Sequence, residues 1–184
     1  MTEDKNKMKP RVLIVDDVET NRFILRDIIT EMNYQPILTE NGMQALKMLQ
    51  FAKPQLIILD IAMPGMDGFE VCRKVKENPL TSDIPIIFIS AYDEPGDIVK
   101  GFEIGCEDYI VKPFEMLEVL ARIEGILRRH GKLQTNIYIG DLEINTLAMT
   151  VKKQGAEIVL TKKEYDLLLL FARNPGIVLH KNTI

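Results

Sequence analysis

Five polar residues in this chain lie at the ends of four short apolar runs, and their types could together perform metal and phosphoryl chemistry. They are Asp16 and Asp17, Asp60, Ser90, and Lys112. If the apolar runs are neighbouring parallel strands, these residues meet at the carboxyl edge of one sheet. Open α/β sheets bind their ligands at that edge. The sequence therefore predicts a polar site there.

The three acids have the chemistry of a hard-cation site. Mg²⁺ takes oxygen ligands, typically one or two carboxylates together with water and phosphate. A carboxylate beside such an ion can also act as a nucleophile toward a phosphoryl group, whose oxygens the metal neutralises. Lys112 would add a second positive charge and Ser90 a hydroxyl donor. One such residue could be an ordinary polar strand end, but five together favour a site.

The elements that must position these residues follow a regular alternation. Alternating strand and helix patterns predict a five-stranded parallel, doubly wound sheet with helices on both faces, which is the flavodoxin-like fold class. The expected strands are 11–15, 35–38, 55–59, 85–89 and 107–111. The expected helices are 19–32, 42–51, 67–77, 95–104 and 115–130.

The pattern changes after a short polar linker. Four short antiparallel strands are expected at 136–140, 142–145, 148–152 and 157–160. A helix should follow from Thr161 to about Arg173, because Thr161 and Glu164 have the spacing of a capping box and Leu160 and Tyr165 that of a hydrophobic staple.

Composition limits the alternatives. The length of 184 residues allows one full domain and part of a second, and a net charge of −4 does not argue for nucleic-acid binding. No apolar stretch is long enough for a membrane span, and residues 1–9 lack the apolar core of a secretory signal. Cys72 and Cys106 have no metal-ligand spacing and are expected to be small buried side chains.

Residues 9–130 closely resemble the receiver domains of bacterial two-component response regulators. The segments that carry the resemblance are Val15-Asp16-Asp17, Leu59 to Gly68, Ser90-Ala91, and Gly105 to Phe114.

The resemblance implies a role for each site residue. Asp60 would accept a phosphoryl group from a sensor histidine kinase, and Lys112 would pair with that group. Mg²⁺ (or Mn²⁺) would bind Asp17, Asp60 and the backbone carbonyl of Ala62 directly, and Asp16 mainly through water. Ser90 and Tyr109 would be the switch residues. The Lys112–Pro113 peptide bond is expected to be cis.

Two neighbours of the site should make the phosphorylated state long-lived. Ala62 lies two residues after Asp60, and Tyr92 lies two residues after Ser90. Neither side chain carries a carboxylate or amide that could orient an attacking water, so slow self-dephosphorylation is expected.

Residues 137–184, after a linker at 131–136, resemble the beginning of an OmpR/PhoB-type winged-helix effector domain. The matching segments are 160–170 and 174–179. That domain continues with a second helix, a recognition helix and a wing, which lie beyond Ile184. The expectation is a fragment of a longer regulator or a truncated product. These 184 residues should not bind a specific operator, and the helix at 161–173 should leave apolar side chains partly exposed.

A homodimer through helix 95–104, strand 107–111 and helix 115–130 is a further implication of that subfamily. Asp108 and Arg122 keep one of its charge pairs. Glu103 would face Glu124, however, and Ile98 would face Glu118 without a charge partner. These two positions argue against the symmetric pairing.

Two functions of different classes follow. The first is a cytoplasmic, phosphorylation-switched transcription regulator that binds DNA only as a complete protein. The alternative is a receiver that acts by protein contact alone, and the reading frame beyond Ile184 would discriminate them. A phosphatase or phosphotransferase is disfavoured because Ala62 cannot be the general acid, so no enzyme activity is expected beyond the chain's own phosphorylation and dephosphorylation. A flavin protein is disfavoured because no phosphate-cradling loop follows Val15.

Overall fold

The computed structural model describes residues 10–133 and 135–173, which form two compact units that divide after Leu133. The first unit contains a five-stranded parallel sheet with the strand order β2-β1-β3-β4-β5. Its strands are β1 (Arg11–Val15), β2 (Gln35–Thr39), β3 (Leu56–Leu59), β4 (Ile86–Ser90) and β5 (Asp108–Val111). The predicted doubly wound sheet is confirmed.

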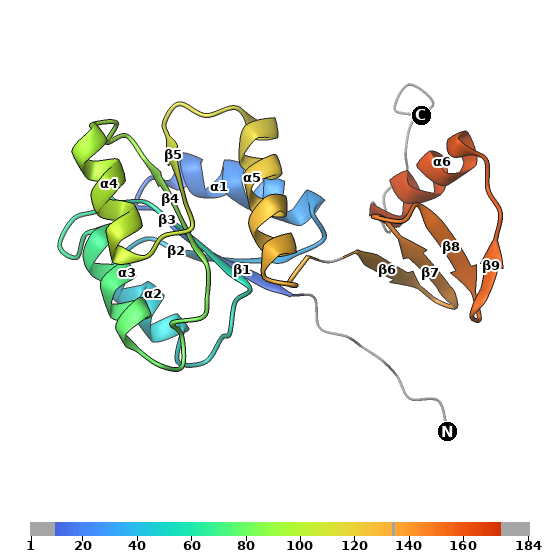
Figure 1. Cartoon of the computed structure of the whole chain (residues 1–184), viewed down its shortest axis with the longest axis horizontal. Helices are drawn as coiled ribbons and strands as arrows, with labels where there is room; N and C mark the ends of the chain where they lie inside the picture. The colour runs from blue at the N-terminus through green and yellow to red at the C-terminus, as the bar shows by residue number, and fades with distance from the viewer. Residues whose placement is uncertain (1–9, 134, 174–184) are drawn as a thin grey trace. The chain divides into compact units, whose positions relative to one another are not determined.

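Helices cover both faces of this sheet (Figure 1). Side chains alternate along each strand, so Val12 and Ile14 of β1 face one layer, and Leu13 and Val15 face the other. The first layer is formed by α1 (Glu19–Glu31) and α5 (Met116–Arg129). The second is formed by α2 (Gly42–Met48), α3 (Gly68–Glu77) and α4 (Pro95–Ile104).

Cys72 and Cys106 are buried free thiols in the second layer, as predicted. Burial raises the pKa of Cys72 to about 11 and that of Cys106 to about 12. Both thiols are therefore protonated at neutral pH and act as small apolar side chains.

The second unit is an antiparallel sheet followed by one helix. Its elements are β6 (Asn136–Ile139), β7 (Leu142–Asn145), β8 (Thr150–Lys153), β9 (Ala156–Ile158) and α6 (Lys162–Arg173). The core consists of Ile137, Ile144, Val151, Tyr165 and Ala172. Leu167 and Phe171 of α6 are partly exposed, as the sequence led us to expect.

The starts of two strands in this unit differ from the prediction. Asn145 Oδ1 accepts hydrogen bonds from the backbone N–H groups of Leu147 and Ala148, and this turn delays β8 to Thr150. The tight turn at Gln154-Gly155, where both residues have positive φ, starts β9 at Ala156. The capping box is confirmed, since Glu164 Oε2 accepts from Thr161 N at 2.8 Å and Glu164 N donates to Thr161 Oγ1.

Candidate functional site

The register of the parallel strands brings the predicted polar residues to one edge of the sheet. Val15 pairs with Leu59, and Ser90 pairs with Val111. Just beyond these pairs, Asp60 N donates to the carbonyl of Val15, and Lys112 N donates to that of Ser90, both at 2.8 Å. The ends of β1, β3, β4 and β5 therefore present their polar residues together, as the sequence predicted.

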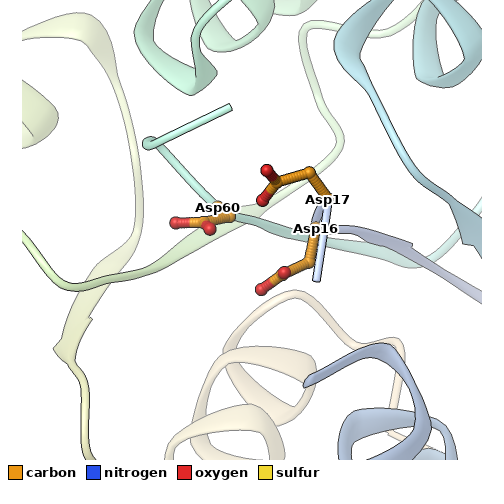
Figure 2. Close-up of side chains that lie close together, drawn as sticks. All are labelled: Asp16, Asp17 and Asp60. Carbon is orange, nitrogen blue, oxygen red and sulfur yellow. The ribbon is translucent and has the colours of Figure 1, made fainter. Parts of the chain in front are cut away.

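Three acids form the centre of this edge. Asp16 and Asp17 come from the end of β1 and Asp60 from the end of β3, and their ligand atoms lie within 4.8 Å of one another. Figure 2 shows the three carboxyl groups gathered in one space. Asp16 and Asp60 are buried, whereas Asp17 is exposed. The cluster thus combines two buried acids with one acid that is open to solvent.

Lys112 bridges the two buried acids. Its Nζ lies 2.8 Å from Asp16 Oδ2 and 3.0 Å from Asp60 Oδ2. Burial raises the pKa of Asp60, and the hydrogen bond from Lys112 offsets only part of that rise. Burial alone would lower the pKa of Lys112, but its hydrogen bonds to Asp16 and Asp60 outweigh that effect and raise it. Lys112 is therefore a firmly held cation at the reacting edge.

Asp16 has further donors that sequence reasoning missed. Val18 N donates to its Oδ1 at 2.8 Å, and Asn21 Nδ2 lies 3.2 and 3.1 Å from its two carboxylate oxygens. Arg22 donates from Nη1 to the backbone carbonyl of Asp16 at 2.6 Å. These contacts come from the N-cap residue and the first turn of α1, and no motif in the sequence signals them.

The residues present fit a hard divalent cation. Among the described residues, none donates a hydrogen bond to the exposed carboxylate of Asp17, whereas several donate to that of Asp16. Asp60 Oδ1 accepts only a long hydrogen bond, 3.3 Å, from Ala62 N. Asp17 and Asp60 therefore keep oxygen lone pairs for direct coordination, while Asp16 is largely occupied. The direct ligation by the Ala62 carbonyl stays a prediction.

The segment after Asp60 is fixed by a helix cap and a close backbone approach. Asp67 caps α3, and its Oδ1 accepts from Glu70 N at 2.7 Å. Gly68 N donates to the carbonyl of Ile61 at 3.0 Å. A Cβ on Gly68 would lie 2.2 Å from the backbone oxygen of Asp60. Only glycine allows α3 to start this close to Asp60.

The two predicted switch residues are linked through the backbone of Tyr92. Ser90 is fully buried, and its Oγ accepts from Tyr92 N at 3.2 Å. The Tyr109 hydroxyl donates to the Tyr92 carbonyl at 2.8 Å, and burial raises the pKa of Tyr109 to about 12. Gly101 of α4 leaves room for the inward-facing ring, because a Cβ there would lie 3.1 Å from Tyr109 Cδ2. The switch roles themselves stay a prediction.

Two further sequence expectations concern neighbouring residues. The Lys112–Pro113 bond is cis, as predicted.

On the face considered for a dimer, Arg122 pairs within its own chain with Asp108 at 2.9 Å and with Glu118 at 2.8 Å. Glu118 thus has a partner within its own chain, which is separate from the pairing expected across a dimer. The dimer itself stays a prediction.

Comparison with known proteins agrees with this geometry. Residues 12–124 match the family model of the response regulator receiver domain. The transcriptional activator protein IrlR of Burkholderia pseudomallei is 38% identical over 175 residues, which are 95% of this chain and 75% of the relative. The DNA-binding response regulator MtrA of Mycolicibacterium smegmatis is 35% identical over 178 residues, 96% of this chain and 77% of the relative.

Solved structures give the same result. DrrB of Thermotoga maritima, described as an OmpR/PhoB homologue, has a TM-score of 0.57 and 29% identity, and the match covers 96% of this chain and 78% of that one. The Vibrio cholerae chemotaxis protein CheY4 has a TM-score of 0.62 and 28% identity, with coverage of 65% of this chain and 99% of that one.

The parallel fold and its acidic edge define a receiver, and this chain belongs to the response regulator family. Its receiver is followed by an OmpR/PhoB-like region, and its relatives are OmpR-type transcription regulators. The family consists of signalling proteins rather than conventional enzymes and implies a histidine kinase partner, and the acidic triad is typical of a receiver metal site. Among the helices described, none could span a membrane.

Proposed function

We propose that Asp60 accepts a phosphoryl group from a sensor histidine kinase and that this modification switches an output. A carboxylate oxygen of Asp60 attacks the phosphorus of a phosphohistidine. An O–P bond forms, the N–P bond breaks, and the electron pair returns to the imidazole nitrogen. Mg²⁺, when held by Asp17 and Asp60, would neutralise the phosphoryl oxygens. The observation that carries this proposal is the Lys112 cation 3.0 Å from Asp60 Oδ2, beside an exposed acid.

The chain's own residues have separate tasks in this proposal. Lys112 would move from Asp60 to the oxygens of the transferred group, where it stabilises their charge. Ser90 would turn its hydroxyl toward the same group. That rotation would change the hydrogen bond between Ser90 and Tyr92, whose carbonyl holds Tyr109. The switch is a local charge change that biases a two-state element.

The proposed output is transcription regulation by DNA binding in the complete protein. It is supported by the names of the relatives, which include a DNA-binding response regulator and a transcriptional activator. The same proposal includes a receiver at 9–130, a linker at 131–136 and a partial effector domain at 137–184. It also includes a homodimer and a cytoplasmic location.

Phosphorylation of the parent chain tests the acceptor. The chain should gain one phosphoryl group when incubated with acetyl phosphate and Mg²⁺, and Asp60→Ala should gain none. Intact mass spectrometry measures both. A gain in neither protein, or in both, would refute Asp60 as the acceptor.

A second prediction concerns the lifetime of the product. The phosphorylated chain should persist for minutes rather than seconds at 25 °C, because Ala62 and Tyr92 cannot orient a water. Ala62 is exposed, so Ala62→Asn should fit and accelerate loss of the group by about tenfold through such a water. Intact mass followed over time after removal of acetyl phosphate measures both rates. Decay of the parent within seconds would contradict this prediction.

A further inference from the structure

The carboxylate of Asp16 accepts hydrogen bonds from three donor groups in the described part of the chain. Its buried carboxylate accepts from Val18 N, from Asn21 Nδ2 and from Lys112 Nζ. The amide of Asn21 is within hydrogen-bond distance of both carboxylate oxygens, at 3.2 and 3.1 Å. Asn21 thus contacts the same carboxylate as the shared lysine.

The shared lysine creates a difficulty for the phosphorylated state. Lys112 Nζ is 2.8 Å from Asp16 and 3.0 Å from Asp60. When Asp60 carries a phosphoryl group, the best position for the ammonium group is against the new oxygens, away from Asp16. A carboxylate that is only 1% exposed would then lose its cation. A buried carboxylate that loses its partner is strongly destabilised unless other donors remain.

We propose that Asn21 is a positioning residue that keeps Asp16 hydrogen-bonded when Lys112 moves to the group on Asp60. This inference rests on the proposed function. The amide dipole partly replaces the lost cation, and its contact with both oxygens keeps the carboxylate in its present orientation. Arg22 holds the backbone of the same residue, so the first turns of α1 fix Asp16 at two points. Asn21 therefore lowers the energetic cost of releasing Lys112.

Binding of Mg²⁺ and binding of a phosphoryl analogue should depend differently on Asn21. A general weakening of the site would reduce both affinities together. We expect Lys112 to stay against Asp16 when Mg²⁺ binds alone, because no anion has arrived to attract it. Beryllofluoride, a phosphoryl analogue that attaches to a carboxylate, places fluorides where the phosphoryl oxygens would be and does require Lys112 to move. Asn21 should matter for the second equilibrium and hardly for the first.

Calorimetric titration of the full chain measures both equilibria. Asn21→Leu keeps the side-chain size but removes the donor, and Asn21→Ala is the second variant in case the first does not fold. Each should bind beryllofluoride, in saturating Mg²⁺, about tenfold more weakly than the parent, as expected for one hydrogen bond to a charged group. Affinity for Mg²⁺ alone should stay within about twofold, because no donor is lost from Asp17 or Asp60. Arg26→Ala, in the same helix and paired with Asp27, is the control and should leave both affinities unchanged.

Each other outcome overturns the inference. Unchanged beryllofluoride binding would mean that Asn21 gives Asp16 no support that matters. An equal loss of both affinities, or failure of both variants to fold, would mean that Asn21 serves the metal site or the fold instead. If the parent does not bind beryllofluoride, or Asp60→Ala binds it equally, the proposed function fails first and this inference with it.

Discussion

Lys112→Met should lower the free energy of unfolding by about 3 kcal/mol at neutral pH, because it leaves two buried carboxylates without their shared cation. Asp16 and Asp60 are 1% and 4% exposed, so solvent cannot replace the ammonium group. The methionine keeps most of the side chain's length, so the loss reports charge rather than volume. Urea unfolding followed by circular dichroism measures it. Phosphorylation by acetyl phosphate should also fall at least about 100-fold, as when a transition-state donor is removed.

The stability lost in Lys112→Met should depend on pH. The pKa of Asp60 is raised by burial, and removal of Lys112 raises it further. The penalty for burying this acid is therefore absent below the usual aspartate range and grows as pH rises through its folded-state pKa. The pKa of Lys112 is raised too, so its stabilising effect is complete below the ordinary lysine range and is lost as pH rises through its folded-state pKa. The gap between parent and variant should be widest near neutral pH.

Two further variants show whether the lost charge is the cause. Lys74→Met removes an exposed lysine that lies 3.4 Å from Glu70, and it should change stability by no more than about 0.5 kcal/mol. Adding Asp60→Asn to Lys112→Met should recover part of the stability, because one of the two unpaired charges is gone. Equal losses for Lys112→Met and Lys74→Met, or no recovery in the double variant, would contradict the bridging role.

The fold and the centre of the site could be predicted from the sequence because both depend on local pattern. Apolar runs without alternation indicated strands buried on both faces, and the polar residue after each run marked the carboxyl edge. Parallel register then required Asp60 to lie beside the end of β1, where its N–H contacts Val15. The capping box at Thr161 could be predicted for the same reason, because it depends only on Thr161 and Glu164, three residues apart.

The contacts that the sequence did not reveal depend on geometry between elements. Asn21 reaches Asp16 only because α1 starts at Glu19 and its first turn lies over the strand end. The space for the Tyr109 ring depends on Gly101, in a helix whose position no motif reports. The ion pair of Arg122 with Asp108 within the chain depends on the placement of α5 relative to β5.

Gly68→Ala should have the largest effect of any single-methyl change in the receiver, lowering stability by about 3 kcal/mol and phosphorylation about tenfold. The new Cβ would lie 2.2 Å from Asp60 O and 2.7 Å from Ile61 Cα. Both are backbone atoms, so no side-chain rotation can relieve the overlap. Either α3 or the segment that carries Asp60 must shift. A shift of Asp60 moves the acceptor away from Lys112 and Asp17, which costs rate as well as stability.

Gly96→Ala is the matched control, because Gly96 also lies in the first turn of a receiver helix, α4, and a Cβ there meets nothing within 4 Å. That variant should be neutral or more stable than the parent by about 0.5 kcal/mol, since alanine is the better helix former. Urea unfolding and the acetyl phosphate reaction measure both proteins. The two defects of Gly68→Ala should also appear together, because one displacement causes both. A variant that loses stability but phosphorylates at the parental rate would show that α3 moves and Asp60 stays, and that Gly68 serves the helix alone.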